Sequence, residues 1–106
     1  MGSFCNASAI IAFLRDKGVD VTIVCSGRLG EEVVEDSLCA EYLKFGFEND
    51  LGDFRLDPDD IYEECLTSPS YLMLKSAGLE DDFEYCMKIN SHDLVPVLDG
   101  DGFILL

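Results

Sequence analysis

The sequence contains no tryptophan, one histidine and three prolines, and only seven basic residues against 22 acidic ones. The resulting formal net charge of −15 at pH 7 makes binding to nucleic acid or to anionic lipid unfavourable, because all three carry charge of the same sign. A basic partner or a divalent cation suits this chain. A small anion would need a local cluster of hydrogen-bond donors or a bound metal ion.

Long hydrophobic runs are also absent, because no stretch of about 18 apolar residues occurs. The first residues, Met1–Asn6, lack the basic flank and the apolar centre of a secretion signal. We therefore expect a cytoplasmic protein that does not associate with membranes.

The five cysteines contain no C-x-x-C pair, and with a single histidine they form neither a zinc-site pattern nor a disulfide framework. They fall within or beside apolar stretches, which predicts reduced, buried thiols that pack as small hydrophobic groups. A nucleophilic thiol is the alternative, and it requires a cationic neighbour in space. The cysteines are Cys5, Cys25, Cys39, Cys65 and Cys86.

The length of 106 residues and the 48% hydrophobic content predict one α/β unit spanning residues 1–106. Apolar residues at helical spacing, with capping residues or prolines before them and glycines after them, predict the helices. A strand followed by a glycine-bearing turn and a helix is typical of α/β proteins. The predicted elements are helices at 6–17, 31–45, from 58 onward, 69–77 and 80–89, a strand at 20–25, and a hairpin of 94–98 with 103–106.

Three predicted strands are few for five helices. A sheet built from them would have uncovered edges, and some helices would have no sheet to cover. The element pattern therefore raises the question of whether another polypeptide supplies the rest of the sheet.

Glu35 is the first candidate for chemistry. It precedes Leu38, Cys39 and Tyr42 by three, four and seven residues, which places its carboxylate on the flank of the apolar stripe of its helix. A carboxylate there needs a hydrogen-bond donor or a metal ion. Asp36 follows about 100° round the helix. The alternative is that both acids simply favour the positive end of the helix dipole.

Two loops that open onto helices are candidate anion sites. In the turn Ser26–Gly30, backbone N–H groups together with the side chains of Ser26 and Arg28 can hold a phosphate or sulfonate oxygen. Glycines in such a turn also serve the chain geometry alone. At the start of the first helix, Ser3 and Asn6 either cap the helix or line a crevice shared with the other loop.

Three segments carry recognisable motifs. Gly2–Ala9 reads GSFCNASA, Cys25–Gly30 reads CSGRLG and Glu35–Ala40 reads EDSLCA. In this order and at about this spacing they resemble the second half of the 2-phosphosulfolactate phosphatase family, whose members read like GSFxNASA, CAGxxG and SLEDxLCAG. A weaker likeness continues at Gly78–Asp82 and Val95–Leu98.

The chain departs from the family pattern at several motif positions. Ser26 stands where the family has alanine, Val33 and Val34 replace a Ser-Leu pair, and Glu41 replaces a glycine. Family members are longer, and their first half carries further motifs that this sequence lacks. The chain therefore resembles a C-terminal portion of a family member.

The resemblance implies an α/β protein with helices packed on a mixed sheet, as the C-terminal half of a larger three-layer α/β/α fold. It implies a magnesium-dependent phosphatase that converts 2-phospho-3-sulfolactate to sulfolactate and phosphate in coenzyme M biosynthesis. The implied partners are this small anionic substrate and either a separate N-terminal half or a homodimer mate, without which the chain is expected to be inactive.

The same resemblance suggests roles for individual residues. Glu35 and Asp36 would hold Mg²⁺ or position the attacking water, as metal-binding and catalytic residues. The substrate's anionic groups would lie against residues of the two loops. These substrate-binding candidates are Ser3, Asn6, Ser26, Gly27 and Arg28.

Two other functions remain open at this point. The first is a non-catalytic acidic α/β interaction module derived from the same fold, which would have no affinity for Mg²⁺. The second is a thiol sensor that uses Cys25 or Cys39.

Overall fold

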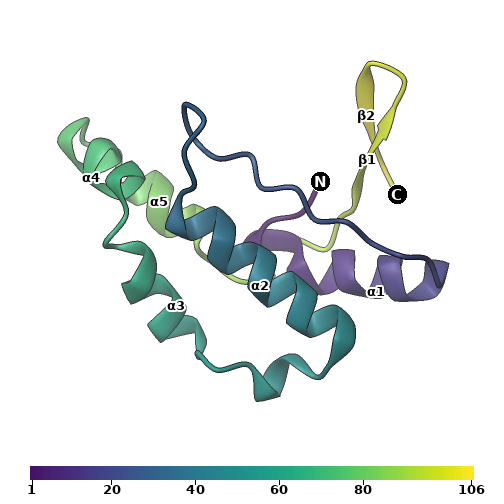
Figure 1. Ribbon diagram of the computed structural model, residues 1–106. Helices are drawn as coiled ribbons and strands as arrows, with labels where there is room; N and C mark the ends of the chain where they lie inside the picture. The colour runs from purple at the N-terminus through teal and green to yellow at the C-terminus, as the bar shows by residue number, and fades with distance from the viewer.

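Helices α1 (Ala7–Lys17) and α2 (Val34–Glu48) pack side by side at the centre of the molecule (Figure 1). The structure, a computed structural model, describes residues 1–106. A 3₁₀ turn, Phe4–Asn6, leads directly into α1. Apolar side chains from both sides fill the contact between the helices. The buried ones include Phe4, Ala7, Leu38 and Tyr42.

Three shorter helices follow along the chain: α3 (Pro58–Cys65), α4 (Pro69–Ser76) and α5 (Glu80–Cys86). Helix α3 packs on α2, and α4 packs on α5 (Figure 1). Their buried side chains extend the same core. These side chains are Ile61, Cys65, Phe83 and Met87.

Local sequence signals set the starts of α3 and α4 as predicted. The Asp57 carboxylate accepts a hydrogen bond from the Asp60 backbone N–H at 2.9 Å, and the Ser68 hydroxyl accepts one from the Tyr71 N–H at 3.1 Å. A proline occupies the first helical position in both, where its missing N–H costs nothing. Gly18, with φ of 60°, ends α1 in the predicted left-handed C-cap.

The predicted C-terminal hairpin is confirmed. Strands β1 (Pro96–Asp99) and β2 (Gly102–Leu105) pair antiparallel, with Asp99 opposite Gly102 at the turn. The hairpin projects away from the helices (Figure 1).

The predicted strand at 20–25 is wrong for the chain as folded here. No backbone group between Val19 and Ser26 bonds to another backbone group, so the sheet contains only β1 and β2. The α/β class is confirmed, but the sheet is a two-stranded antiparallel one instead of the expected mixed sheet. The β-branched sequence favours an extended chain, yet a strand forms only when a neighbour supplies hydrogen-bond partners.

Helix α2 begins at Val34 instead of Glu31, because Arg28 and Glu31 close a tight turn first. Helix α5 ends at Cys86, short of the predicted Ile89. Helix α2 has 15 residues, and no helix of the structure reaches the length and hydropathy needed to cross a bilayer.

Gly46 of α2 lies against Ile11 of α1 and against Leu51 of the 3₁₀ turn Leu51–Asp53. A Cβ atom there would overlap the Ile11 Cδ1 atom and would lie 2.7 Å from Leu51 Cδ2. On the same side, the Arg15 guanidinium donates to the carbonyl of Asn49 at 2.7 Å, beyond the last turn of α2. The absence of a side chain at 46 therefore permits the packing of α1 on α2.

Replacement of Gly46 by alanine should lower the free energy of unfolding by about 1–3 kcal/mol, because overpacking outweighs the better helix propensity of alanine. Urea unfolding followed by circular dichroism measures this difference. Gly102→Ala is the control, since its Cβ would meet nothing within 4 Å and should change stability by less than about 0.5 kcal/mol. Equal effects of the two substitutions would contradict this account of the α1–α2 contact.

Candidate functional site

The second predicted loop folds back on the first turn of α2. The Asp36 carboxylate accepts hydrogen bonds from the Gly27 backbone N–H at 2.6 Å and from the Ser26 hydroxyl at 3.0 Å. Both bonds reach the same oxygen, Oδ2, and the structure shows no bond to Oδ1. Three candidate residues therefore lie together, and one carboxylate oxygen of Asp36 remains available.

The backbone of this loop explains its glycines. Gly27 has φ of 65°, and a Cβ atom there would lie 2.7 Å from the Glu31 carbonyl oxygen. The Arg28 and Glu31 backbones exchange two hydrogen bonds of 2.9 Å around Leu29 and Gly30, which both have positive φ. Positive φ at both central residues is typical of tight two-residue hairpin turns. Chain geometry thus requires the glycine at 27, which agrees with the alternative that glycines in this turn serve the chain geometry.

The N-terminus of α2 is open to an anion. Val33 is the N-cap, and no side chain accepts a hydrogen bond from the first-turn N–H groups. The N–H groups of Val34, Glu35 and Asp36 have no partner within the protein. Unpaired N–H groups and the positive end of the helix dipole favour a negatively charged group at this place. The neighbouring carboxylates oppose one unless a cation lies between them.

Glu35 lies half-buried on α2. Its Oε2 atom is the one buried side-chain oxygen or nitrogen of the structure that has no hydrogen-bond partner. Its negative charge contributes, after burial, to raising the pKa of the Cys65 thiol on α3. A carboxylate oxygen withdrawn from water without a donor is costly, so a cation or an external donor would stabilise it.

Arg28 extends away from the Asp36 turn. Its Nη2 atom lies 2.9 Å from the sulfur of Met73 on α4, and its side chain is exposed. In this conformation the guanidinium does not meet Ser26, Gly27 or Asp36.

The first predicted loop is tied to the chain that leads into β1. The Asn6 side chain is 4% exposed, and its amide N–H groups donate to the carbonyls of Met1 and Leu94, each at 3.1 Å. Its carbonyl oxygen accepts from the Ser3 N–H at 2.8 Å and from the Ser3 hydroxyl at 3.2 Å. All of these bonds are internal, so Asn6 joins two distant segments, and Ser3 is the exposed member of the pair.

No hydrogen bond joins the two loops. Neither the cavity of about 1020 Å³ nor the cavity of about 390 Å³ is lined by any of the seven candidate residues. The structure brings no group of three or more His, Cys, Asp or Glu side chains together in a way that could hold a metal ion. Glu35 and Asp36 are the two acidic residues in the first turn of α2.

The cysteines are all free thiols, but the prediction that all are buried is wrong. Cys65 is buried, whereas Cys25 and Cys86 are exposed, because they lie on the unpaired stretch before α2 and at the end of α5. Burial raises the pKa of the Cys39 thiol to about 12, with Asp36 adding to the effect, and burial raises that of Cys65 to about 11. Cys39 is therefore protonated at neutral pH and unsuited to sensing oxidants.

The comparisons with known proteins decide the family. The sequence model of the family described as 2-phosphosulpholactate phosphatase matches residues 1–101. The chain belongs to the 2-phosphosulfolactate phosphatase family. The predicted resemblance is thereby confirmed.

Several family members are similar to nearly the whole chain. Proteins named probable 2-phosphosulfolactate phosphatase share 32% identity in Clostridium botulinum strain Eklund 17B and 34% in Thermotoga maritima. The matches cover 95% and 97% of this chain but 48% and 49% of those proteins. A Thermus thermophilus protein of the same name is 32% identical over 94% of this chain and 47% of its own length. The chain thus spans about half the length of these family members.

Sequence reasoning did not find the unpaired N–H groups of α2 or the contact of Arg28 with Met73. The sequence does predict the turn that contains Leu29 and Gly30, because a glycine between a strand-like run and a helix often marks a tight turn. The Arg28 contact joins residues 45 positions apart, and no local pattern signals it.

The raised pKa values of the Cys39 and Cys65 thiols lead us to expect that the free energy of unfolding falls at alkaline pH. The native Cys39 thiol keeps its proton up to about pH 12, whereas an unfolded thiol loses it near 9.0. Above pH 9 the unfolded state binds fewer protons, so the free energy of unfolding should be constant below about pH 8 and fall between about pH 9 and 12. Urea titrations across this range measure the fall. Cys39→Ala should make the fall smaller and leave the part that Cys65 contributes, whereas Cys25→Ala, at an exposed thiol, should leave most of it. Identical profiles for all three proteins would refute the assignment.

Proposed function

We propose that this chain supplies part of the active site of a phosphatase that hydrolyses 2-phospho-3-sulfolactate to sulfolactate and phosphate in coenzyme M biosynthesis. The observation that carries the proposal is the family match over residues 1–101, with its Ser-Gly and Glu-Asp motifs lying at the start of α2. The names of the similar family members give the substrate class.

In this proposal the start of α2 receives the substrate's phosphate or sulfonate. The three unpaired N–H groups of its first turn are the donors. The Ser26 hydroxyl, which donates to Asp36 in this structure, would join them by turning toward the anion. The Gly27 N–H holds Asp36 in place and fixes the turn beside the anion. Hydrolysis places a water oxygen on phosphorus, breaks the ester P–O bond and leaves the proton on the sulfolactate hydroxyl. Donors fixed before the reaction stabilise the charge that builds on the phosphoryl oxygens.

Glu35 and Asp36 would hold Mg²⁺. The fit rests on the unpartnered Oε2 of Glu35 and the free Oδ1 of Asp36, because Mg²⁺ binds hard oxygen ligands and uses one or two carboxylates together with waters and phosphate oxygens. The ion would offset the negative charges of the carboxylates and the substrate. This matters in a chain of net charge −15, which would otherwise repel its substrate.

The remaining candidates take supporting roles. Ser3 is exposed and its hydroxyl can turn toward a ligand, while Asn6 positions the loop through its four internal bonds. Arg28 would have to leave Met73 to reach an anion at α2. Two carboxylates and one arginine are few for a phosphatase site, so the proposal includes further residues from an N-terminal half or from a homodimer mate.

The alternative is an acidic interaction module without catalysis. The internal bonding of Asn6 and the contact of Arg28 with Met73 favour it, because both keep polar groups away from a substrate. Titration calorimetry with Mg²⁺ separates the two functions. The module predicts no heat of binding above that of Glu35→Gln.

Activity of a Glu35→Gln variant tests the proposal. The chain is co-expressed with the N-terminal half of the Thermotoga maritima relative, and phosphate release from 2-phosphosulfolactate is measured with Mg²⁺. Glu35→Gln should lower kcat/KM by about 100-fold or more, because it removes a charged ligand from the site. The free energy of unfolding should stay equal or rise, since a buried unpaired charge is removed.

Glu63→Gln is the matched control, because Glu63 is exposed on α3 and its side chain makes no hydrogen bond or ion pair. It should keep full activity. Full activity of Glu35→Gln, or no phosphate release from a folded wild-type assembly, would reject the catalytic role.

A further inference from the structure

Residues 19–26 form an extended run of chain without strand partners (Figure 1). Its sequence, VDVTIVCS, is dominated by β-branched residues, which favour sheets. Its backbone N–H and C=O groups form no hydrogen bond with other backbone groups over eight consecutive residues. Such a run is an open template for pairing with another strand.

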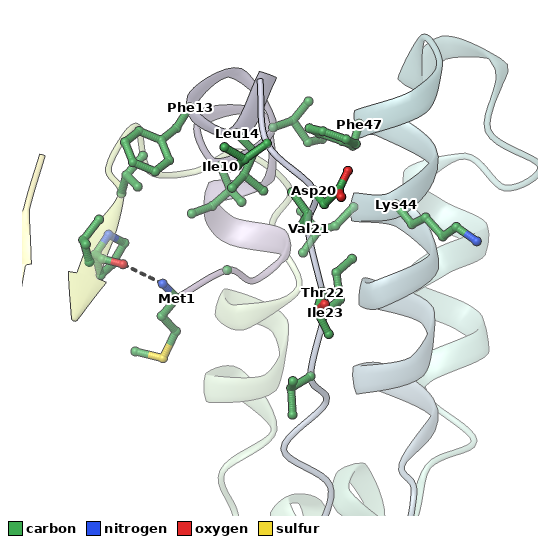
Figure 2. A pocket seen from close by; sticks show the side chains of 18 of the residues that line it. Met1, Ile10, Phe13, Leu14, Asp20, Val21, Thr22, Ile23, Lys44 and Phe47 are labelled. Atoms are coloured by element: carbon green, nitrogen blue, oxygen red, sulfur yellow. Dashed lines mark hydrogen bonds between the residues drawn. The ribbon is translucent and has the colours of Figure 1, made fainter. Parts of the chain in front are cut away.

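A second open edge lies across from it. Strand β1 pairs with β2 along one side, and the structure shows no strand on its other side. Pro96, Val97 and Leu98 of β1 line the same cavity as residues 19–24. At this edge the Met1 amino group donates to the Pro96 carbonyl (Figure 2), a bond that an incoming strand would replace.

The cavity between the two edges is a groove of about 1020 Å³ with an apolar floor. Figure 2 shows Ile10, Phe13 and Leu14 of α1 on one side and Phe47 of α2 on the other, with Val21 and Ile23 on the stretch that runs between the helices. Of its 21 lining residues, 15 are hydrophobic. This lining suits the apolar side chains of a strand.

The area that remains exposed is large enough for a stable contact. The chain exposes 7117 Å², against about 5900 Å² for a folded monomer of this size. Its radius of gyration of 14.3 Å exceeds the usual value of about 13 Å. The excess of about 1200 Å² is more than the roughly 800 Å² that each partner contributes to a standard interface.

More than half of the large exposed hydrophobic side chains lie on the two segments that border the groove. Of the fourteen large exposed ones, three lie in residues 19–24 and five in residues 98–106. Val24, at 85% exposure, is the most open of those that line the groove. Apolar surface of this extent on a small chain marks an interaction site.

We propose that the groove is a β-docking site for the half of a 2-phosphosulfolactate phosphatase that this chain does not match. One or more strands of that half enter between residues 19–26 and β1, pair with both open edges and cover the apolar faces of α1 and α2. The result is a continuous sheet on a helical layer.

Two observations select this occupant over a second copy of the chain. About half of each similar family member lies outside the part that this chain matches, so a polypeptide of suitable size exists in the family. Two copies would bring charges of −15 each into contact at neutral pH, which disfavours self-association. The inference does not depend on catalysis, because an inactive assembly would dock in the same way.

The test is co-expression of the 106-residue chain with the N-terminal half of the Thermotoga maritima relative, followed by light scattering and hydrogen exchange. We expect a one-to-one complex in which the amides of residues 19–26 exchange at least tenfold more slowly than in the chain alone. Val24→Pro removes one pairing N–H that the isolated chain does not use, and Val24→Lys places a charge in the groove. Each should weaken the complex at least tenfold.

Leu72→Lys on α4 is the matched control, because Leu72 is an exposed hydrophobic residue outside the groove. It should bind like the wild type. The inference is overturned if no complex forms, if residues 19–26 exchange rapidly within it, or if Val24→Lys binds like Leu72→Lys. It is also overturned if the chain alone already protects these amides, as a homodimer or as a monomer closed on its own hairpin. A complex that forms without releasing phosphate supports docking and rejects the catalytic proposal.

Discussion

The contact between α1 and α2 is the constraint on which the rest of the structure depends. Gly46 and Ala7 permit a close approach, and the core of α3 and α5 builds outward from the buried face of α2. The same contact fixes where the chain can run between the helices. It therefore places Ser26 and Gly27 against Asp36, and it leaves an apolar floor under residues 19–24.

Charge and hydrogen bonding oppose each other at the start of α2. Unpaired N–H groups favour an anion, whereas Glu35 and Asp36 oppose one, and the conflict is resolved only if a cation joins them. The Oε2 atom of Glu35 is buried there without a hydrogen-bond partner, and this is the observation on which the proposed cation site rests. The backbone groups of residues 19–26 likewise have no backbone partner, and the proposed docking site rests on them.

Local signals made most of the helices predictable. Asp57 and Ser68 predicted the starts of α3 and α4, and Gly18 predicted the end of α1. These predictions succeed because each capping hydrogen bond joins residues close in sequence. The start of α2 was misplaced by three residues, since the turn at Leu29-Gly30 competes with the helix for the same residues. In the candidate site, the position of Glu35 on the flank of the apolar stripe was readable from its spacing, and its lack of a partner was not.

The sequence by itself determined the α/β class, the hairpin, the helix caps and the family, because periodicity, capping and motif order are properties of neighbouring residues. Only the tertiary structure decided that residues 20–25 remain unpaired, that Asn6 bonds to Leu94 and that Arg28 reaches Met73. The physical reason is that these outcomes depend on partners far along the chain. A strand's hydrogen bonds and a carboxylate's donor come from residues that no local pattern identifies.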